Sequence, residues 1–298
     1  MLDLLSEHLK ARKFEIKENH NLRAETYIQI DTVASIAVYP RSIDELIDVT
    51  KILAESGAPY RILGRMSNVL FKTQKYNGVI VKTDRINGFN FDKTILTLEC
   101  GCFFPNAVKK AARLNLGGFE GLWGIPASVG GMLRQNAGAY GYQISDRFLS
   151  CTAYDTESSS LLNLDKEDMH FSYRSSVLEA NRYVVLSACF LASEQPANEI
   201  FSGANRFAEI RRSSQPVAEP SLGSVFKKHC NVGAGYFIDR LGLKGTACGG
   251  AAISDKHAGF IVNTGNATSQ DVIKLIEYIK ERVLLEFGVA LEEEIEII

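Results

Sequence analysis

Apolar residues recur with helical spacing in two long segments of the chain. In the first, from Ser42 to Gly57, intervals of one to five positions separate the apolar side chains of a stripe: Ile43, Leu46, Ile47, Ile52 and Leu53. This stripe predicts an amphipathic helix, with Ser42 and Glu45 as a capping box and Gly57 as its stop. The second predicted helix covers residues 268–287 and stops at Gly288. Shorter helices are predicted over residues 105–114, 199–212 and 233–241.

Between these helices, period-two alternation or short apolar runs predict strands. They cover residues 59–63, 69–71, 79–81, 94–99, 148–154, 183–191, 260–262 and 291–298, and residues 27–38 are predicted as a broken strand region. In the last segment, alternation places Glu292, Glu294 and Glu296 on one face. Three carboxylates on a strand face usually mark solvent, whereas a carboxylate that faces a cleft is a candidate polarising or proton-transfer group.

Residues 121–141 follow neither pattern and hold six glycines, one proline and a single charged residue. Because glycine loses backbone entropy on folding, such a cluster is expected where the chain needs φ > 0 or approaches something closely. Main-chain groups around Asn136 and Gly138 suit a flat polar ring or a phosphate. The alternative is a tight inter-strand crossing, which accounts for Gly130 and Gly131 but less well for the wider cluster.

Two smaller polar clusters are also candidate sites. The loop 64–68, GRMSN, follows a predicted strand and is read equally well as a phosphate-binding loop or as a plain turn. Arg174 lies in the aromatic and hydroxyl cluster 171–175, either as a surface residue or as a bidentate carboxylate clamp. The general exposure of arginine favours the surface interpretation.

Composition excludes several classes of function. Lys+Arg 33 against Asp+Glu 35 gives a formal net charge of -2, which offers no electrostatic attraction to nucleic acid. The start of the chain lacks the apolar core of a signal peptide, and no apolar run is long enough to cross a bilayer. A cytoplasmic protein without membrane insertion is therefore expected. The six cysteines lack metal-knuckle spacing, so we expect reduced thiols and no metal site.

Five motifs follow one another along the chain: GIPASVGGMLRQNAGAYG at 124–141, FSYRSS at 171–176, RRSSQP with PSLGSVFK within 211–227, GLKGTACGGAAISDKHAGFIVN at 242–263 and LEEEI at 291–295. Together and in this order they resemble the UDP-N-acetylenolpyruvoylglucosamine reductase family of bacterial cell-wall synthesis. The resemblance covers nearly the whole chain. Five ordered motifs are far more specific than any one of them.

The resemblance implies an α+β / α/β architecture. Two subdomains of the type named after vanillyl-alcohol oxidase and PCMH, expected over residues 1–86 and 87–195, would enclose FAD. A C-terminal α/β domain, residues 196–298, would bind the substrate. It also implies the compact family type without a tyrosine-loop insertion, because Tyr173 and Arg174 run on to the next strand with little intervening chain.

The same resemblance implies an NADPH-dependent flavoprotein oxidoreductase that reduces UDP-N-acetylglucosamine enolpyruvate to UDP-N-acetylmuramate for peptidoglycan synthesis, and so serves cell shape and division. Its partners would be FAD, NADPH and a nucleotide-sugar substrate, and the protein would be a monomer. FAD would pass a hydride from NADPH to the enolpyruvyl methylene, which leaves negative charge on the neighbouring carbon and carboxylate.

By position in the motifs, three residues are implied to be catalytic. Arg174 would stabilise the developing charge, Ser224 would donate the proton that quenches it, and Glu294 would orient and polarise the substrate. The implied FAD-binding residues are Gly64, Arg65, Met66, Ser67, Asn68, Ile125, Pro126, Ser128, Gly130, Gly131, Asn136, Ala137 and Gly138. The implied substrate-binding residues are Tyr173, Lys227 and Lys228.

The chain departs from the family pattern in the loop at 64–68, where the family's usual sequence is GGGSN. Either Arg65 and Met66 adopt φ < 0 and point away, or flavin affinity is reduced. This departure supports an alternative function, a non-catalytic flavin- or nucleotide-binding paralogue that kept the fold. Retention of Arg174, Ser224 and Glu294 together argues against that alternative, because a binding module has no need of all three.

Overall fold

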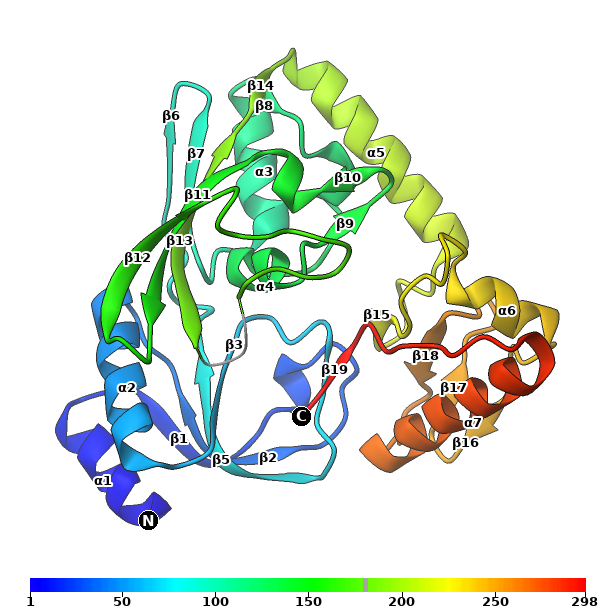
Figure 1. Ribbon diagram of the computed structural model, residues 1–298, viewed down its shortest axis with the longest axis horizontal. Helices are drawn as coiled ribbons and strands as arrows, with labels where there is room; N and C mark the ends of the chain where they lie inside the picture. The colour runs from blue at the N-terminus through cyan, green and yellow to red at the C-terminus, as the bar shows by residue number, and fades with distance from the viewer. Residues whose placement is uncertain (179–181) are drawn as a thin grey trace. The chain divides into compact units, whose positions relative to one another are not determined.

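The computed structural model describes residues 1–178 and 182–298, which form two compact units (Figure 1). The first unit contains residues 1–20, 34–65 and 77–209, and the second contains residues 21–33, 66–76 and 210–298. The three predicted domains, with their two boundaries, are not tested by this division and stay a prediction.

The helices of the chain are α1 (Leu2–Ala11), α2 (Ile43–Ser56), α3 (Phe104–Arg113), α4 (Val129–Arg134), α5 (Ala197–Ser214), α6 (Ala234–Arg240) and α7 (Ser269–Phe287), with 3-10 turns at Arg23–Glu25, Glu120–Leu122 and Ile144–Asp146. The predicted helix starts and stops are confirmed where caps define them. Ser42 accepts a hydrogen bond from Glu45 N, and Gly57 closes α2 in the left-handed region at φ +67°. The capping box of α2 is only half formed, because the Glu45 carboxylate accepts from Arg41 N instead.

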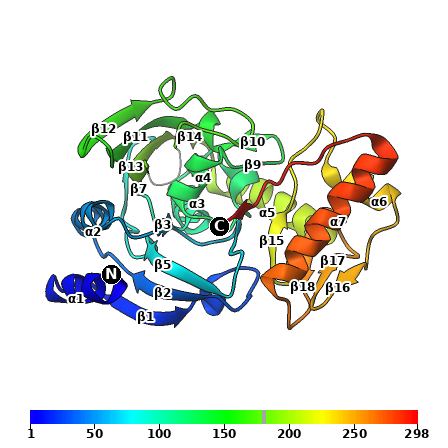
Figure 2. The ribbon, with the colours of Figure 1, turned by 60° about the horizontal axis from the view of Figure 1, so that its bottom comes forward.

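Two sheets organise the first unit. The strands β1 (Ile16–Asn21), β2 (Val33–Val38), β5 (Lys75–Lys82) and β3 (Tyr60–Leu63) form one sheet in that order, and α1 and α2 lie side by side along it (Figures 1 and 2). The other sheet has the order β12 (Ser160–Asp165), β11 (Phe148–Asp155), β13 (Tyr183–Leu191), β7 (Ile95–Glu99), β6 (Phe89–Asp92). One continuous apolar core runs through both sheets and the helices α1 to α4.

Short strand pairs complete the first unit. They are β8 (Leu116–Gly117) with β14 (Ser193–Glu194), and β9 (Gly138–Ala139) with β10 (Tyr142–Gln143). The sheet β1-β2-β5-β3 contains the parallel pair β3 and β5, with Leu63 opposite Lys82. Because the carboxyl ends of parallel strands meet at one edge, the loops that follow β3 and β5 lie together.

The second unit is built on the sheet β15 (Ser221–Ser224), β18 (Phe260–Asn263), β17 (Ala251–Ile253), β16 (Ala247–Cys248), which α7 crosses (Figure 2). A parallel pair joins β19 (Glu296–Ile297) to β4 (Val69–Leu70). Thr268 and Asp271 form the capping box of α7, and Gly288 ends it at φ +66°. Ile28, Ile30 and Leu70 belong to the core of this unit, so the short segments 21–33 and 66–76 are integral to it.

Two predictions of secondary structure need correction, and a third is confirmed. The glycine-rich stretch contains the helix α4, and Gly130 and Gly131 lie on it, so the inter-strand crossing proposed for them is wrong. The broken strand region predicted over 27–38 is confirmed, because only β2 is regular and Gln29 interrupts the extended chain at φ +53°. The strand predicted over 291–298 is regular only at β19, because residues 292–294 hydrogen-bond to 225–227 before the chain turns to β4.

Candidate functional site

Gly64 touches the glycine-rich stretch directly. A Cβ at position 64 would lie 2.0 Å from Ser128 Oγ and 2.9 Å from Ser128 Cβ, closer than real Cβ atoms come to other heavy atoms. Ser128 is buried and precedes α4. The structure therefore brings together two segments that were predicted separately to bind the cofactor, and it explains why glycine stands at position 64.

The two side chains that follow Gly64 behave differently. Arg65 lies over the Phe103 ring, 4.8 Å from its centroid, and its Nε is 3.6 Å from Asp84 Oδ1. Met66 has φ +50° and only 3% of its surface is exposed. Of the two alternatives, the one in which both residues adopt φ < 0 is therefore wrong for Met66, which takes the left-handed conformation that glycine adopts most easily. Reduced flavin affinity, the other alternative, stays a prediction.

The start of α4 is tied to the sheet by its own backbone. Val129 N donates to Cys102 O at 3.1 Å, and Gly130 N donates to Cys100 O at 2.9 Å. Ile125 and Pro126 are half-buried just before it. A Cβ at Gly131 would meet only Ser128 Oγ, at 3.5 Å, so the packing of the described residues does not itself demand glycine there.

These features fit a bound flavin nucleotide. Exposed backbone at Gly131 leaves a surface that a side chain would cover, which suits the close approach of a ligand. Arg65 Nε and Asp84 Oδ1 are buried and lack a hydrogen-bond partner within residues 1–178 and 182–298. The two atoms lie 3.6 Å apart as an ion pair, so they compensate each other's charge without a hydrogen bond.

Asn136 connects the glycine-rich turn to the segment around Arg174. Its Nδ2 donates to Gln143 Oε1 at 3.2 Å and to Ser172 O at 3.0 Å, and its Oδ1 accepts from Ser145 N. Asn136 is buried with φ +39°, a conformation that asparagine tolerates better than most residues. Ala137 and Gly138 follow it, and Gly138 begins the strand pair of the turn.

Arg174 is half-buried and anchored to this turn. Its Nη2 donates to Gly138 O at 3.0 Å, and its guanidinium carbon lies 5.1 Å from the centroid of the exposed Tyr173 ring. Arg174 has φ +54°, inside a tight turn closed by the Ser172–Ser175 pair. The interpretation of Arg174 as a plain surface residue does not describe this arrangement, because backbone and side chain are both held. Little chain separates Arg174 from β13, as the compact family type requires.

Ser224 and Glu294 lie on neighbouring segments of the second unit. Ser224 ends β15 opposite Phe260, after Gly223 at φ +79°, and its Oγ donates to Phe226 O at 3.3 Å. Glu294 N donates to Val225 O at 2.7 Å, so its backbone lies beside the residue that follows Ser224.

The neighbouring charged residues of this segment form ion pairs. Lys227 Nζ lies 3.3 Å from Glu292 Oε2, and Lys280 Nζ lies 2.8 Å from Glu293 Oε1. Asn68 Nδ2 donates to Glu294 O at 2.9 Å, which links Asn68 to the segment that carries Glu294. Lys228 is exposed, and Ser67 is half-buried. Arg174 belongs to the first unit, and Ser224 and Glu294 belong to the second.

Sequence reasoning missed Lys82 and Asp84. Lys82 has only 1% of its surface exposed, and its Nζ donates to Gly64 O at 2.5 Å and lies 2.9 Å from Asp84 Oδ2. The signal was present in the sequence, because a lysine that directly follows the apolar run Val79–Val81 in a buried strand needs a partner.

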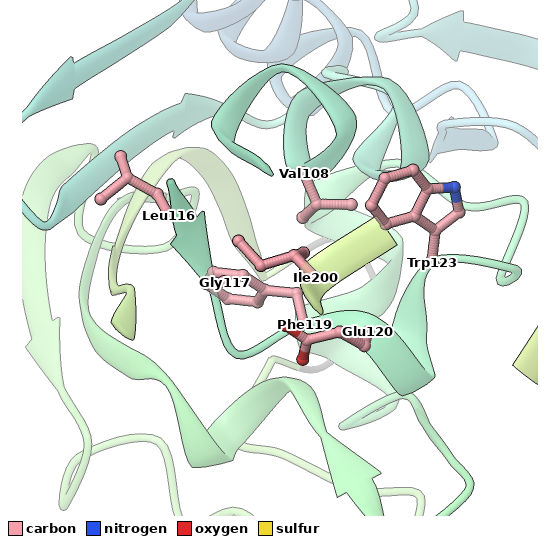
Figure 3. Close-up of a pocket in the computed structure, with 7 residues that line it drawn as sticks. All are labelled: Val108, Leu116, Gly117, Phe119, Glu120, Trp123 and Ile200. Carbon is pink, nitrogen blue, oxygen red and sulfur yellow. The ribbon is translucent and has the colours of Figure 1, made fainter. Parts of the chain in front are cut away.

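A small hollow in the first unit is part of the core instead of a ligand site. It lies between α3, β8 and α5, has about 140 Å³ of empty space and no room for a water molecule, and is lined by Val108, Leu116, Gly117, Phe119, Glu120, Trp123 and Ile200 (Figure 3). Apart from the Glu120 side chain its lining is apolar, and Glu120 Oε1 accepts from Gly118 N.

Three of the six cysteines are buried thiols that resist ionisation. Burial raises the pKa of the Cys100 thiol to about 12, of Cys102 to about 11 and of Cys151 to about 12. All six cysteines are unpaired thiols. Among the described residues, no group of His, Cys, Asp and Glu could hold a metal ion, and no helix is long and apolar enough to span a membrane.

Comparison with known proteins matches both parts of the chain to family models. Residues 34–164 match the FAD binding domain, and residues 215–298 match the C-terminal domain of UDP-N-acetylenolpyruvoylglucosamine reductase. The chain is 40% identical to the UDP-N-acetylenolpyruvoylglucosamine reductase of Caldicellulosiruptor saccharolyticus, over 97% of this chain and 94% of that protein. It is 36% identical to that of Clostridioides difficile, over 96% and 94%.

Solved structures agree with these relatives. The UDP-N-acetylenolpyruvylglucosamine reductase of Thermus caldophilus superposes with a TM-score of 0.79 at 29% identity, covering 95% of this chain and 98% of that chain. The Physcomitrella patens BBE-like 1 protein superposes with a TM-score of 0.50 at 11% identity, over 64% of this chain and 44% of that chain, which is a likeness of fold alone. The predicted fold class, an FAD-binding fold of the vanillyl-alcohol-oxidase type followed by a substrate-binding domain, is confirmed.

Proposed function

The chain belongs to the UDP-N-acetylenolpyruvoylglucosamine reductase family, and we propose that Arg174, Ser224 and Glu294 carry out catalysis in this member. The enzyme is a flavoprotein oxidoreductase of peptidoglycan synthesis that uses FAD and NADPH. FAD, when bound, carries the hydride from NADPH to the enolpyruvyl double bond. No comparison favours the alternative of a non-catalytic paralogue.

One observation carries the proposal for Ser224 and Glu294. These residues are far apart in sequence, yet the hydrogen bond from Glu294 N to Val225 O holds their backbones side by side. Ser224 Oγ, as a neutral hydroxyl, is a weak acid in water. It becomes an effective proton donor when a strongly basic carbanion lies within hydrogen-bond reach, and Glu294 would orient the substrate for that transfer.

Arg174 suits the stabilisation of the negative charge that builds on the substrate carboxylate. Its guanidinium is planar, always charged, and fixed at one end by Gly138 O. A donor fixed before the reaction loses little entropy when charge develops, which is the condition for effective electrostatic stabilisation. The stacking of Arg174 on Tyr173 further restricts its orientation.

The substrate's diphosphate is proposed to bind near Lys227 and Lys228, and Tyr173 is proposed to contact the substrate beside Arg174. Lys227 is half-exposed and paired with the exposed Glu292, so an incoming phosphate would compete with that carboxylate for the ammonium. The remaining residues proposed to bind FAD are those of the loop 64–68 and of the glycine-rich stretch. We further propose that the enzyme acts as a monomer in the cytoplasm.

The test measures the rates of the two half-reactions, flavin reduction and flavin reoxidation, separately in the Ser224→Ala variant by rapid mixing. Reduction of the bound flavin by NADPH, followed as bleaching of its visible absorbance, should proceed at the wild-type rate. Reoxidation by the enolpyruvyl substrate should slow by about 10²- to 10⁴-fold, the usual contribution of a general acid. Ser221→Ala, on the same strand β15, is the matched control and should leave both rates unchanged.

Equal slowing of both half-reactions in Ser224→Ala would contradict the proton-donor role. Wild-type protein that stays colourless after addition of FAD would contradict the flavoenzyme function itself.

A further inference from the structure

Lys82 has the most deeply buried charged side chain among residues 1–178 and 182–298. It ends β5, directly after three fully buried apolar residues. A lysine is almost never buried to this extent unless its ammonium is paired. The catalytic proposal above does not use Lys82, so the burial needs another explanation.

The ammonium of Lys82 is held by two oxygens. Nζ donates to Gly64 O at 2.5 Å and lies 2.9 Å from Asp84 Oδ2. The parallel pairing of β3 and β5 creates this geometry, because Leu63 lies opposite Lys82 and Thr83 N donates to Leu63 O at 3.0 Å. The loop that follows β3 therefore starts directly over the Lys82 side chain.

Asp84 extends this contact to the next residue of the loop. Its second oxygen, Oδ1, lies 3.6 Å from Arg65 Nε, while the Arg65 guanidinium stacks on Phe103. Lys82, Asp84 and Arg65 thus form a chain of alternating charge beneath the loop 64–68, and Ser128 packs against Gly64 from another direction.

The Gly64–Arg65 peptide bond is trans, as are all those described. In a trans peptide the C=O and the following N–H point in opposite directions. Because Lys82 binds Gly64 O, the N–H of Arg65 is directed away from the buried ammonium. That orientation presents a main-chain donor on the loop's other side, where an anionic oxygen can accept it.

We propose that Lys82, held in place by Asp84, is a positioning residue that fixes the Gly64–Arg65 peptide for the diphosphate group of FAD. This inference rests on the proposed assignment of residues 64–68 to the cofactor. Without the lysine, the Gly64 carbonyl would lose its buried donor, and the Asp84 carboxylate would keep Arg65 but lose its closer cationic partner beside the diphosphate.

The experiment measures the dissociation constant of FAD from apo-protein by flavin fluorescence, and separately the melting temperature of the apo-protein. Lys82→Met keeps length and apolar stem and removes the charge. We expect it to raise the FAD dissociation constant by about 10-fold or more, the loss of one charge-assisted hydrogen bond. At saturating FAD, kcat should stay within about threefold of wild type, because the proposed role is in cofactor affinity.

A double-mutant cycle tests whether Asp84 acts through Lys82. Asp84→Asn should raise the FAD dissociation constant by about 3-fold, and the double variant should bind FAD no more weakly than Lys82→Met alone. Lys75→Met, an exposed lysine on the same strand, is the matched control and should leave the constant unchanged. If Lys82→Met yields no folded apo-protein, the Asp84→Asn variant provides the test. An unchanged FAD dissociation constant in Asp84→Asn would then overturn the proposal.

A Lys82→Met variant that binds FAD within twofold of wild type would overturn the proposal, as would multiplying effects in the double variant. The Gly64→Ala variant distinguishes a wrong role for Lys82 from a wrong assignment of the loop 64–68 to FAD. Its Cβ would collide with Ser128 Oγ and so disturb the loop directly. If Gly64→Ala weakens FAD binding and Lys82→Met does not, only the role of Lys82 is wrong. If neither variant weakens it, the assignment of the loop to FAD is wrong as well.

Discussion

Met66 combines two opposing contributions to stability at a single residue. A non-glycine residue at φ +50° costs about 1 kcal/mol relative to glycine. The Met66 side chain is almost fully buried, and truncation of a buried methionine costs about 2–5 kcal/mol. Burial is the larger of the two, which explains how methionine can occupy a left-handed position.

We therefore expect Met66→Gly to lower the free energy of unfolding of the apo-protein by about 1–3 kcal/mol, although it restores glycine at a left-handed position. Urea denaturation followed by circular dichroism measures this difference. A variant as stable as wild type, or more stable, would show that backbone strain outweighs burial at residue 66.

His257 is held in its neutral form by its surroundings. Burial lowers the pKa of His257 below its ordinary value of 6.5, and the nearby Lys244 adds to this effect. Its Nδ1 accepts a hydrogen bond from Gly259 N at 3.1 Å, which an imidazolium could not do. The ring also packs edge-on against Phe260, 4.8 Å between centroids.

Because the unfolded chain binds the proton of His257 more readily than the folded chain does, this contribution to stability is complete above pH 6.5 and is lost as the pH falls through the lowered pKa. We expect His257→Gln to lose less melting temperature than wild type between about pH 7 and pH 5. His8→Gln, at an exposed position in α1, is the control. Equal losses in wild type and His257→Gln would refute the linkage.

Among the elements, α5 supports the glycine-rich turn. Phe207 of α5 stacks on Tyr140, with ring centroids 5.1 Å apart and planes inclined by 22°, and meets Tyr142 edge-on. Tyr140 has φ +54°, so aromatic packing holds a backbone that glycine would adopt more easily. The turn that carries Asn136 and Gly138 is thus braced by a helix from outside its own motif.

We expect Phe207→Ala to lower stability by about 1–2 kcal/mol, since the ring is half-buried and an aromatic pair adds about 0.5–1.5 kcal/mol beyond its buried area. It should also broaden the visible spectrum of bound flavin by loosening the turn, whereas Phe207→Tyr should preserve both properties. Thermal unfolding and absorbance spectroscopy measure them. A Phe207→Ala variant with wild-type stability and a wild-type flavin spectrum would contradict the proposal that Phe207 supports the glycine-rich turn.

Elements with local determinants were predictable from the sequence. The helices α2 and α7 have both an apolar stripe and capping residues, so their bounds follow from short-range interactions. The segment 291–298 was predicted only in part. Its alternation predicts an extended chain, but it does not predict that residues 292–294 pair with residues 225–227 and residues 296–297 pair with β4. Strand β12 escaped prediction because both of its faces are largely exposed.

In the candidate site too, residues whose role depends on contacts distant in sequence were not predicted. The motifs led to the residues proposed for catalysis and cofactor binding, but not to Lys82 or Asp84, whose importance arises from contacts with Gly64 and Arg65. The positive φ of Met66 was likewise not predictable, because a sequence shows which side chain is present but not whether burial compensates for backbone strain.

On the scale of the whole molecule, the second unit is assembled from three separate stretches of chain. Residues 210–298 supply its main sheet and helices, and residues 21–33 and 66–76 complete its core. Asn263 Nδ2 donates to Ile28 O at 2.9 Å and to Gln29 O at 3.1 Å, and Asn263 is itself buried. Removing the short segments would leave those donors without partners.

We therefore expect residues 210–298, produced alone, to be less ordered than in the full chain. Amide hydrogen exchange should be fast in β18 and near 295–298 in the fragment, and slow in the full-length protein. The full chain with Asn263→Ala is a milder test and should lose about 1–3 kcal/mol. A fragment with native protection factors would show that the short segments are dispensable.

The pairing of β19 with β4 has a consequence for biosynthesis. Lys72 N donates to Ile298 O, and Ile298 N donates to Leu70 O, so β4 can form this pair only after residues 296–298, far along the chain, have been synthesised. Asn68, in the proposed cofactor loop, waits in the same way for Glu294 and Glu296. A nascent chain stalled before these residues would leave that loop unanchored, so we expect FAD to bind only after residues 294–298 have been synthesised.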